Sequence, residues 1–332
     1  MKQAAWDVRL DGQIVDINSR LLSLSITDNR GLEADCLTVV LSDHDGKLRL
    51  PPTGRELAVC VGYKNAALVD RGKFIVSEIR HDGPPDQLMI SAKSADFSAQ
   101  RLRAGRKKSW LVADTGGKLG NIVKTIAAAH KLESRIAPPL VAVEVGHIDQ
   151  TESDAHFLTR LAEENDAIAT IKAGRLLFIP TGAGQTASGK ALPTVQIQRH
   201  DGDAHSFSRA DQEQYTGVRA FYDDKRGARR KHVDVGADGY RKHLQRTCAT
   251  KERAYAAAKA SWQRLQRETV SIDLTLADAP PNIFAETPLE LSGFNKPEID
   301  GKHWTTTRAG LTINDQGLTG KVNAEKRITE TS

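Results

Sequence analysis

The sequence is poor in aromatic and sulfur-containing residues and has no long hydrophobic run. Its 332 residues include 8 Phe, 5 Tyr, 4 Trp, 3 Cys and 2 Met, and the mean hydropathy is −0.43. No stretch approaches the ~18 consecutive apolar residues that a membrane-spanning helix needs, which excludes a helical membrane protein. We therefore expect several thin cores built mainly from aliphatic side chains.

The cysteines Cys36, Cys60 and Cys248 are few and scattered. No Cys-x-x-Cys pair or Cys/His cluster is present, which excludes a zinc site of the usual spacing, and an odd number argues against a disulfide framework. The pattern predicts reduced thiols in a protein assembled in the cytoplasm. The N-terminus lacks the apolar segment of a secretory signal, so we expect none.

The charge excess is small. The chain has 47 Lys and Arg against 42 Asp and Glu, a net charge of +5. Proteins that bind nucleic acid strongly usually have a larger excess of positive charge, so this balance does not indicate such a partner. The length predicts roughly two to three domains.

The first hundred residues alternate between polar and apolar side chains. A period of two predicts strands with one buried and one solvated face. Turn signals such as Asp45-Gly46 and Pro51-Pro52 separate them. The expected strands cover 8–14, 22–28, 35–43, 56–63, 72–79 and 87–92. Short strands at this spacing predict a closed or sandwich-like β domain over 1–104.

Helical periodicity begins beyond residue 105. Four apolar residues fall at i, i+3, i+4 and i+7, which predicts one helix face: Leu119, Ile122, Val123 and Ile126. We expect Asp114 or Thr115 to cap this helix. A second helix is expected over 153–165, with Thr151-x-x-Asp154 as its capping box. With a strand at 175–179, this pattern predicts a small α/β domain over 105–185.

Strand-like alternation returns after a flexible Gly/Ala/Ser/Thr linker at 182–189. A helix is expected at about 251–267, capped by Thr250, and it is followed by further strands. The predicted third domain covers 186–327. The sequence therefore predicts an α+β fold, mainly β, in which two β-barrel or sandwich domains flank a small α/β insert.

Several short motifs suggest chemistry, but their context argues against it. The segment 184–190 resembles a P-loop, yet Ala191 replaces the metal-binding hydroxyl and a strand follows instead of a helix. Asp114-Thr115-Gly116 matches the motif of aspartic proteases but has no second copy. The ten histidines are dispersed. We therefore predict no catalytic residue, no metal and no cofactor.

A basic stretch at 225–246 is the main candidate contact site. We interpret it as a loop whose candidate interaction residues are Arg226, Arg229, Arg230 and Lys231. A solvated loop or a contact with another protein is favoured over nucleic acid, because few aromatic residues accompany the charges. We expect no specific nucleic-acid partner and no membrane partner.

The C-terminal third carries a specific resemblance to a known family. It consists of a segment at 246–267, a strand at 270–276, the run 287–294, Glu298-Ile299-Asp300-Gly301 with Trp304, and Gly317-Leu318-Thr319-Gly320. This order resembles the late control gene D family of contractile phage tails, as does the segment 152–162. It is also similar to the hub part of type VI secretion spike proteins. The resemblance covers nearly the whole chain.

The resemblance implies a structural baseplate hub and no enzyme activity. Three copies would form a ring of six tube-like domains that joins the sixfold tail tube to the threefold central spike. The implied partners are further copies of the chain, a separate spike protein and the tail tube protein, with tape measure and baseplate wedge proteins as further candidates. The implied location is the tail baseplate, assembled in the bacterial host cytoplasm, of a phage or of a phage-derived bacteriocin. The alternative is a tail component that binds or degrades peptidoglycan through 105–185.

Overall fold

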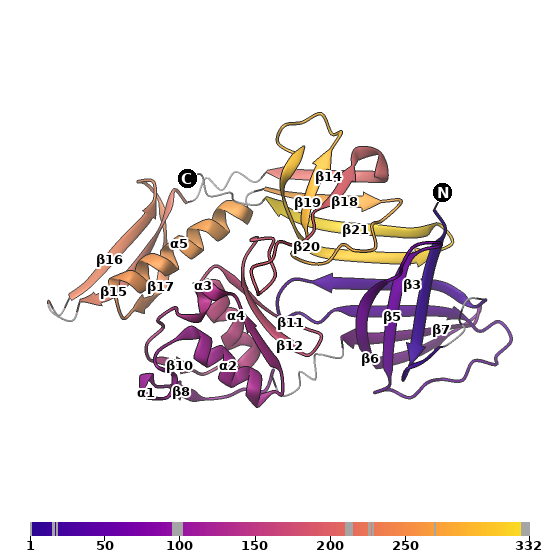
Figure 1. Ribbon diagram of the computed structural model, residues 1–332, viewed down its shortest axis with the longest axis horizontal. Helices are drawn as coiled ribbons and strands as arrows, with labels where there is room; N and C mark the ends of the chain where they lie inside the picture. Colours follow the sequence, from indigo (N-terminus) through magenta and orange to yellow (C-terminus); the bar gives the residue numbers. More distant parts are fainter. Residues whose placement is uncertain are drawn as a thin grey trace. The chain divides into compact units, whose positions relative to one another are not determined.

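The computed structural model of the chain describes residues 2–14, 17, 19–94, 102–209, 215–224, 227, 229–268 and 270–326. The described part is mainly β, as the sequence predicts (Figure 1). The chain divides into two compact units. Unit 1 consists of Met1–Ser98, Pro193–Phe207 and Ile272–Ala324, and unit 2 of Ala99–Leu192, Ser208–Ser271 and Glu325–Ser332.

Unit 1 contains two β modules, which we call module A and module B. Module A comprises β1 (Ala4–Leu10), β2 (Gln13–Ile14), β3 (Leu21–Asn29), β4 (Cys36–Ser42), β5 (Glu56–Tyr63), β6 (Val69–Asp82) and β7 (Gln87–Ser94). Module B comprises β13 (Val195–Gln198), the 3-10 turn η1 (Arg199–Asp201), β14 (Gly202–Arg209), β18 (Val270–Leu276), β19 (Pro288–Ser292), β20 (Gly301–Asn314) and β21 (Gly317–Lys326). Module A confirms the strands expected in the first hundred residues.

The two modules have the same strand order. Strands in module A pair as β3–β4–β7–β6–β5–β1, and those in module B pair as β14–β18–β21–β20–β19–β13. Both series match one to one in chain order, so β3 corresponds to β14 and β6 to β20. The modules differ at one end, where β1 is antiparallel to β5 but β13 is parallel to β19. The fold therefore contains an internal duplication that the sequence does not display as a repeat.

Backbone hydrogen bonds align the two modules residue by residue. Val76 in β6 donates to the carbonyl of Arg55 (2.9 Å) and accepts from the N–H of Gly54 (2.8 Å). Thr306 in β20 makes the same pair of bonds, with Thr287 (3.0 Å) and with the residue before it (2.8 Å). Val76 and Thr306 are therefore equivalent positions.

The largest buried side chain of each module occupies the same aligned position. Phe74 lies two residues before Val76, and Trp304 lies two residues before Thr306. Both rings are fully buried, and the Trp304 indole N–H donates to the carbonyl of Ile299 (2.7 Å). Each core therefore contains one large aromatic side chain, and such a side chain typically buries about 150–250 Å².

The part of unit 2 that follows module A is a small α/β body. It comprises β8 (Lys108–Trp110), α1 (Val112–Thr115), α2 (Leu119–Ala129), β9 (Glu133–Ile136), α3 (Pro138–Val141), β10 (Ile148–Gln150), α4 (Asp154–Glu164), β11 (Ala167–Lys172) and β12 (Arg175–Pro180). β8 pairs with β10, and β9, β12 and β11 form a second sheet. The predicted apolar stripe of α2 is fully buried.

Both predicted helices are present, but their predicted caps are wrong. Asp114 and Thr115 belong to the short helix α1, and Lys118 occupies the N-cap position of α2 without a side-chain hydrogen bond. Ser153 caps α4, because its hydroxyl accepts the N–H of His156 (3.3 Å). No described helix is long and apolar enough to cross a membrane.

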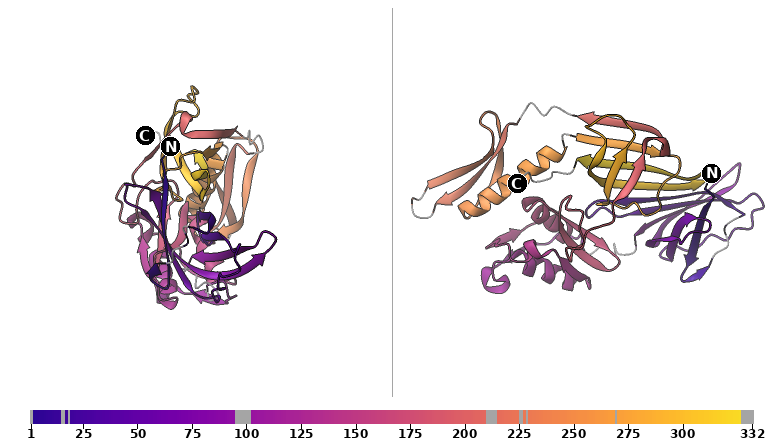
Figure 2. Two further views of the ribbon diagram at one scale, coloured as in Figure 1. Left: turned by 90° about the vertical axis from the view of Figure 1, so that its right-hand side faces the viewer. Right: turned by 45° about the horizontal axis from the view of Figure 1, so that its top comes forward.

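The rest of unit 2 is a three-stranded sheet covered by one long helix. β15 (Gly217–Asp224) lies between β16 (Arg229–Gly236) and β17 (Arg241–Cys248). The helix α5 (Lys251–Glu268) lies across one face of this sheet (Figures 1 and 2). Their shared core contains Val218, Ala220, Ala254, Ala258 and Leu265. Thr250 caps the helix as predicted, by accepting the N–H of Arg253 (3.3 Å).

This helix and sheet form an insertion in module B. Module A connects β3 to β4 through residues 30–35, whereas module B has β15, β16, β17 and α5 between the corresponding strands β14 and β18. The compact units therefore differ from the predicted domains, because 208–271 groups with 99–192 and not with the rest of 186–327.

The predicted linker at 182–189 has an ordered turn. Thr186 donates its N–H to the carbonyl of Lys190 (2.8 Å), and Gln185 forms an isolated bridge with Ala191. The strand β13 follows, so no helix N-terminus is available at this segment to complete a P-loop.

Candidate interaction surfaces

The predicted interaction residues lie on a strand, so the prediction of a loop at 225–246 is wrong. Arg229, Arg230 and Lys231 begin β16, and β17 starts at Arg241. Arg226 lies outside the described residues. Because side chains alternate along a strand, Arg230 and Lys231 point to opposite faces of the sheet. The structure therefore separates residues that the sequence groups together.

We call the sheet face that points away from α5 the outer sheet face. The apolar side chains of β15 and β16 face α5, so the alternate residues face outward. With the matching positions of β17, the outer sheet face contains Arg219, Phe221, Arg230, His232, Asp234, Arg241 and His243.

Phe221 is the apolar centre of the outer sheet face. The guanidinium of Arg230 lies 4.0 Å from the centre of its ring. The rings of His232 and His243 contact it edge-on, with centroid distances of 6.3 and 5.8 Å. A cation stacked on an aromatic ring contributes ~0.5–1 kcal/mol at an exposed site. Arg230 is therefore held over Phe221 instead of extending freely into solvent.

Asp234 lies among the cations of the outer sheet face. Its carboxylate accepts two hydrogen bonds from Arg219, each 2.8 Å long, and Arg241 is 3.6 Å away. The bond from Arg219 is the main cause of a lowered pKa for Asp234. On the opposite face, Asp224 pairs with Lys231 at 2.7 Å and raises the pKa of that lysine.

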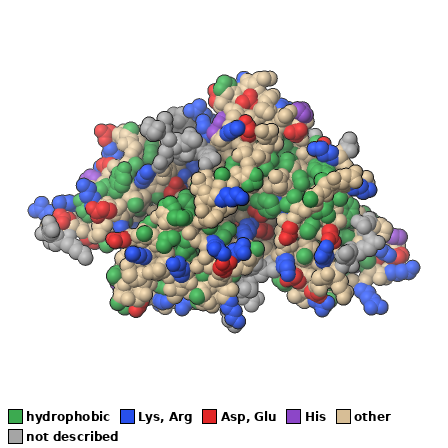
Figure 3. Space-filling view, in the orientation of Figure 1, with side chains coloured by type: hydrophobic (Ala, Val, Ile, Leu, Met, Phe, Trp, Pro, Cys, Tyr) green, Lys and Arg blue, Asp and Glu red, His purple; other side chains and the backbone are tan. Residues whose placement is uncertain are grey.

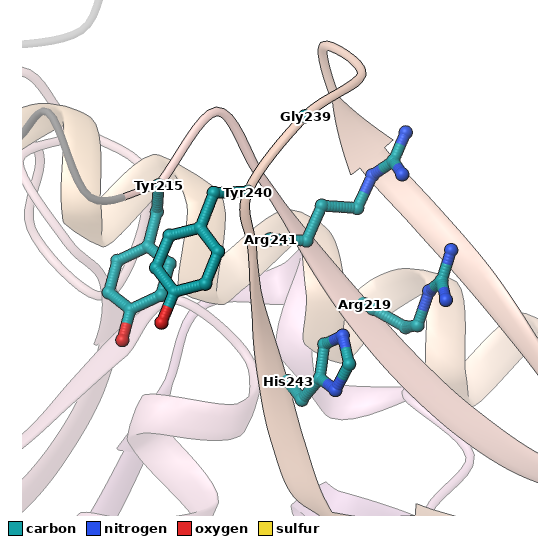
Figure 4. A pocket seen from close by; sticks show the side chains of 6 residues that line it. All are labelled: Tyr215, Arg219, Gly239, Tyr240, Arg241 and His243. Carbon is teal, nitrogen blue, oxygen red and sulfur yellow. The ribbon is translucent and has the colours of Figure 1, made fainter.

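One end of the outer sheet face opens into a pocket of about 430 Å³. Its lining consists of Tyr215, Arg219, Gly239, Tyr240, Arg241 and His243 (Figure 4). The two tyrosine rings lie face to face, with centroids 5.2 Å apart and planes 8° apart. Both arginines are already paired with carboxylates. The pocket therefore has an aromatic wall and a basic wall whose arginines are paired with carboxylates.

Among the described residues of the outer sheet face, cations are mixed with a carboxylate. On the face drawn in Figure 3, Lys and Arg side chains alternate with Asp and Glu side chains. The arginines of the outer sheet face are paired with Asp234 or stacked on Phe221. Nucleic-acid binding relies on cations that are free to replace counterions along the phosphate backbone. The described arginines of the outer sheet face are not free in this sense.

A buried carboxylate in the α/β body has a structural role. Asp154 accepts hydrogen bonds from Gln150 (2.7 Å), His130 (2.8 Å) and Arg106 (3.1 Å). Burial raises the pKa of Asp154, but these three donors together lower it below its usual value. The Trp110 indole in turn donates to Gln150 (2.9 Å). Within the described residues, no group of three or more His, Cys, Asp or Glu side chains could hold a metal ion.

A second surface of interest is the junction between the two β modules of unit 1. Its main contact is antiparallel pairing of β3 with β20, from Asn29 opposite Arg308 to Leu24 opposite Ile313. The first half of β20 pairs with β19, and only its second half pairs with β3. In Figure 1 the strands β20 and β3 accordingly lie side by side. One continuous sheet therefore runs through both modules.

One buried and one partly buried side chain of module A hold this junction together. Arg71 of module A donates to the carbonyl of Ile283 (2.8 Å), and its guanidinium lies 3.9 Å from the ring centre of Phe284. The hydroxyl of Tyr63 donates to the carbonyl of Ala279 (2.9 Å). Sequence reasoning missed these residues, because an arginine or tyrosine in an alternating strand gives no sign that its partner lies some 210 positions away.

The comparisons with known proteins agree with this architecture. A family model described as phage tail baseplate hub (GPD) matches residues 117–317. A probable baseplate hub protein of Escherichia phage P2 is 40% identical over 95% of this chain and 90% of its own length.

Two solved structures share the fold at low sequence identity. A 43 kDa tail protein of prophage MuSo2 from Shewanella oneidensis has a TM-score of 0.71 and 13% identity, over 98% of both chains. A type VI secretion component from E. coli has a TM-score of 0.59 and 10% identity, over 97% of this chain and 77% of its own. The sequence matches, supported by this shared fold, show that the chain belongs to the phage tail baseplate hub family.

Proposed function

We propose that three copies of this chain form the ring that joins a sixfold tail tube to a threefold central spike. The observation that carries this proposal is the strand-for-strand duplication of modules A and B in one chain. Three copies supply six similar modules, which match six tube subunits. A ring of three identical chains also presents three identical faces to a threefold partner.

The insertion in module B supports a different binding partner for each of the two units. Modules A and B together give six similar modules in the ring, whereas the outer sheet face occurs once per chain and therefore three times. A surface present in three copies matches the spike and not the tube. Of the predicted residues, we assign contact with the spike protein to Arg230 and the rest of the outer sheet face, whereas Arg229 and Lys231 point to the opposite face and Arg226 lies outside the described residues.

The proposed location is the baseplate of a virion tail, assembled in the host cytoplasm. The spike and tail tube proteins are the main proposed partners, and tape measure and wedge proteins are further ones. The role is structural, and it requires no catalytic residue, metal or cofactor. Neither a membrane nor a specific nucleic acid is part of the proposal.

The oligomeric state in the presence of partners tests this proposal. We expect light scattering after size-exclusion chromatography to give the mass of three chains, for the isolated protein or after addition of its spike partner. The tail tube protein should then bind the trimer. A chain that remains monomeric with both partners present would overturn the proposal. A stable dimer would do the same, because two chains cannot supply six modules.

A further inference from the structure

Two strand segments in unit 1 have unpaired edges that correspond to the two sides of the internal junction. The second half of β20 pairs with β3, but no described strand pairs with the equivalent part of β6, residues 78–82, on the side away from β7. Similarly, no described strand pairs with β14, the counterpart of β3, on the side away from β18. Unpaired strand edges are templates for a further strand.

We propose that β14 of one copy pairs with residues 78–82 of β6 in the next copy, in the geometry that β3 adopts with β20. The proposal rests on the trimeric ring and names the contact that closes it. The internal junction would then be repeated between chains, so that six equivalent junctions alternate within and between copies around the ring. The occupant of both edges is a second copy of this chain.

The aligned hydrogen bonds predict the register of this contact. Val76 and Thr306 are equivalent, so Arg80, four residues later, takes the place of Gly310. On the other strand, the backbone carbonyl of Arg20 accepts the N–H of Ser42 (2.7 Å). The carbonyl of Asp201 accepts the N–H of Ala277 in the same way (3.1 Å). Counting seven residues onward from Arg20 and from Asp201 makes Ser208 equivalent to Thr27. Gly310 and Thr27 are paired within the chain, so Arg80 and Ser208 should be paired between chains.

The faces of the strands agree with this alignment of β6 and β20. β6 has a bulge between Val76 and Glu78. At the matching point of β20, the buried positions shift from Trp304 and Thr306 to Ala309. Both strands therefore change face at the same place, and the alignment holds on both sides of the irregularity.

A similar comparison supports the alignment of β14 with β3. Phe207 contacts Trp304 edge-on, with ring centroids 6.3 Å apart, so it faces the core of module B. Its counterpart Ile26 is buried in module A. In this register Ser206 and Asp82 replace Ser25 and Thr312, whose hydroxyl oxygens are 3.1 Å apart. A serine hydroxyl donating to a carboxylate would preserve that cross-strand hydrogen bond.

Engineered disulfides in the full-length chain test the register. Thr27 and Gly310 form a non-hydrogen-bonded pair, because the hydrogen-bonded position is Arg30 with Thr307 (3.2 Å). Cβ atoms at such pairs lie close enough for a disulfide. We expect Arg80→Cys with Ser208→Cys to give covalent trimers on mild oxidation, reversed by dithiothreitol. Mixing the two single variants should give covalent dimers, which shows that the bond joins different chains.

Three controls make the result specific. The wild type, with its three native thiols, should give no such products. Ser25→Cys with Thr312→Cys should form a bond within one chain, which verifies the oxidation conditions at the internal junction. Arg80→Cys with Ser206→Cys is offset by two residues, where the separation is ~7–8 Å, and it should react at least ~tenfold more slowly.

The possible results distinguish failure of the β14–β6 contact from failure of the trimeric ring. Covalent trimers from the matched pair, faster than from the offset pair, support the proposal. A non-covalent trimer in which neither pair cross-links would overturn the β14–β6 contact and leave the ring intact. Faster cross-linking of the offset pair would overturn the register. A chain that stays monomeric with its spike and tube partners would overturn both the ring and this contact.

Discussion

Single residues carry the least predictable part of this structure. Asp154 appears in the sequence as part of a capping box, but its carboxylate accepts hydrogen bonds from three side chains. Arg71 and Tyr63 appear as strand residues, but both connect module A to module B. Local patterns predict which face of a strand is buried. They do not identify the distant residue with which a polar side chain forms its hydrogen bond.

Replacing Asp154 with Asn should destabilise unit 2. The variant keeps the size of the side chain but removes the charge that holds Arg106 and His130, so we expect a loss of ~1–3 kcal/mol at pH 7. A lowered pKa means that the carboxylate stabilises the fold above its usual pKa and loses this effect as the pH falls through the lowered value.

Urea unfolding from pH 7 to pH 2.5 measures this effect. The difference between wild type and Asp154→Asn should shrink at the acidic end, where the wild-type carboxyl is also neutral. Asp114→Asn, at an exposed position in α1 of the same body, is the control and should leave the midpoint unchanged. A constant difference at every pH would contradict the assigned role of the charge.

Tyr63 should make the module junction sensitive to alkali. Burial, with a smaller effect of Asp278, raises the pKa of Tyr63 from 10.0 to about 12. The raised value means that the neutral hydroxyl is favoured in the folded state. Its contribution is complete below pH 10 and is lost as the pH rises towards 12.

Tyr63→Phe is the matched variant for this prediction. It should cost ~1 kcal/mol at pH 8, where the hydrogen bond to Ala279 is lost. Its stability should then fall less steeply than that of the wild type between pH 10 and pH 12. Chemical denaturation at several pH values in this range provides the measurement, and parallel curves for the two proteins would show that Tyr63 is not the titrating group.

At the scale of elements, periodicity predicts the strands and helices whose faces are strongly apolar. The strands of module A, the stripe of α2 and the helix α5 were all predictable in this way. β16 was not, because Val233 and Val235 are its only apolar residues and a run of cations precedes them. The pairing of β3 with β20 was also hidden, because strand edges leave no signal in the sequence.

Reversing one charge on the outer sheet face should weaken binding of the spike protein. Arg230 is stacked on Phe221 and faces outward, so Arg230→Glu should lower the affinity by about tenfold or more while α5 stays packed. Lys231→Glu places the same change on the opposite face and should have a much smaller effect. Isothermal titration calorimetry of both variants against the spike protein distinguishes them, and equal losses would argue against this surface.

At the scale of the whole molecule, the duplication explains the composition. Two β modules and an inserted unit divide the apolar residues among several cores, so each core is small and a few rings such as Phe74 and Trp304 occupy the centres. On the outer sheet face, the described arginines Arg219, Arg230 and Arg241 are paired or stacked, so the net charge of +5 does not appear there as free cations. The family and the mainly β architecture were predictable from sequence. The equivalence of the two modules required the strand pairings.

The central claim is that one chain supplies two equivalent modules to a threefold ring. Electron cryo-microscopy of the purified hub, alone or bound to its spike protein, measures this most directly. We predict a ring of three chains in which modules A and B alternate evenly around a central channel and β14 of each chain lies beside β6 of the next. A ring with another number of chains, or with modules A and B at unequal distances from the axis, would contradict the account.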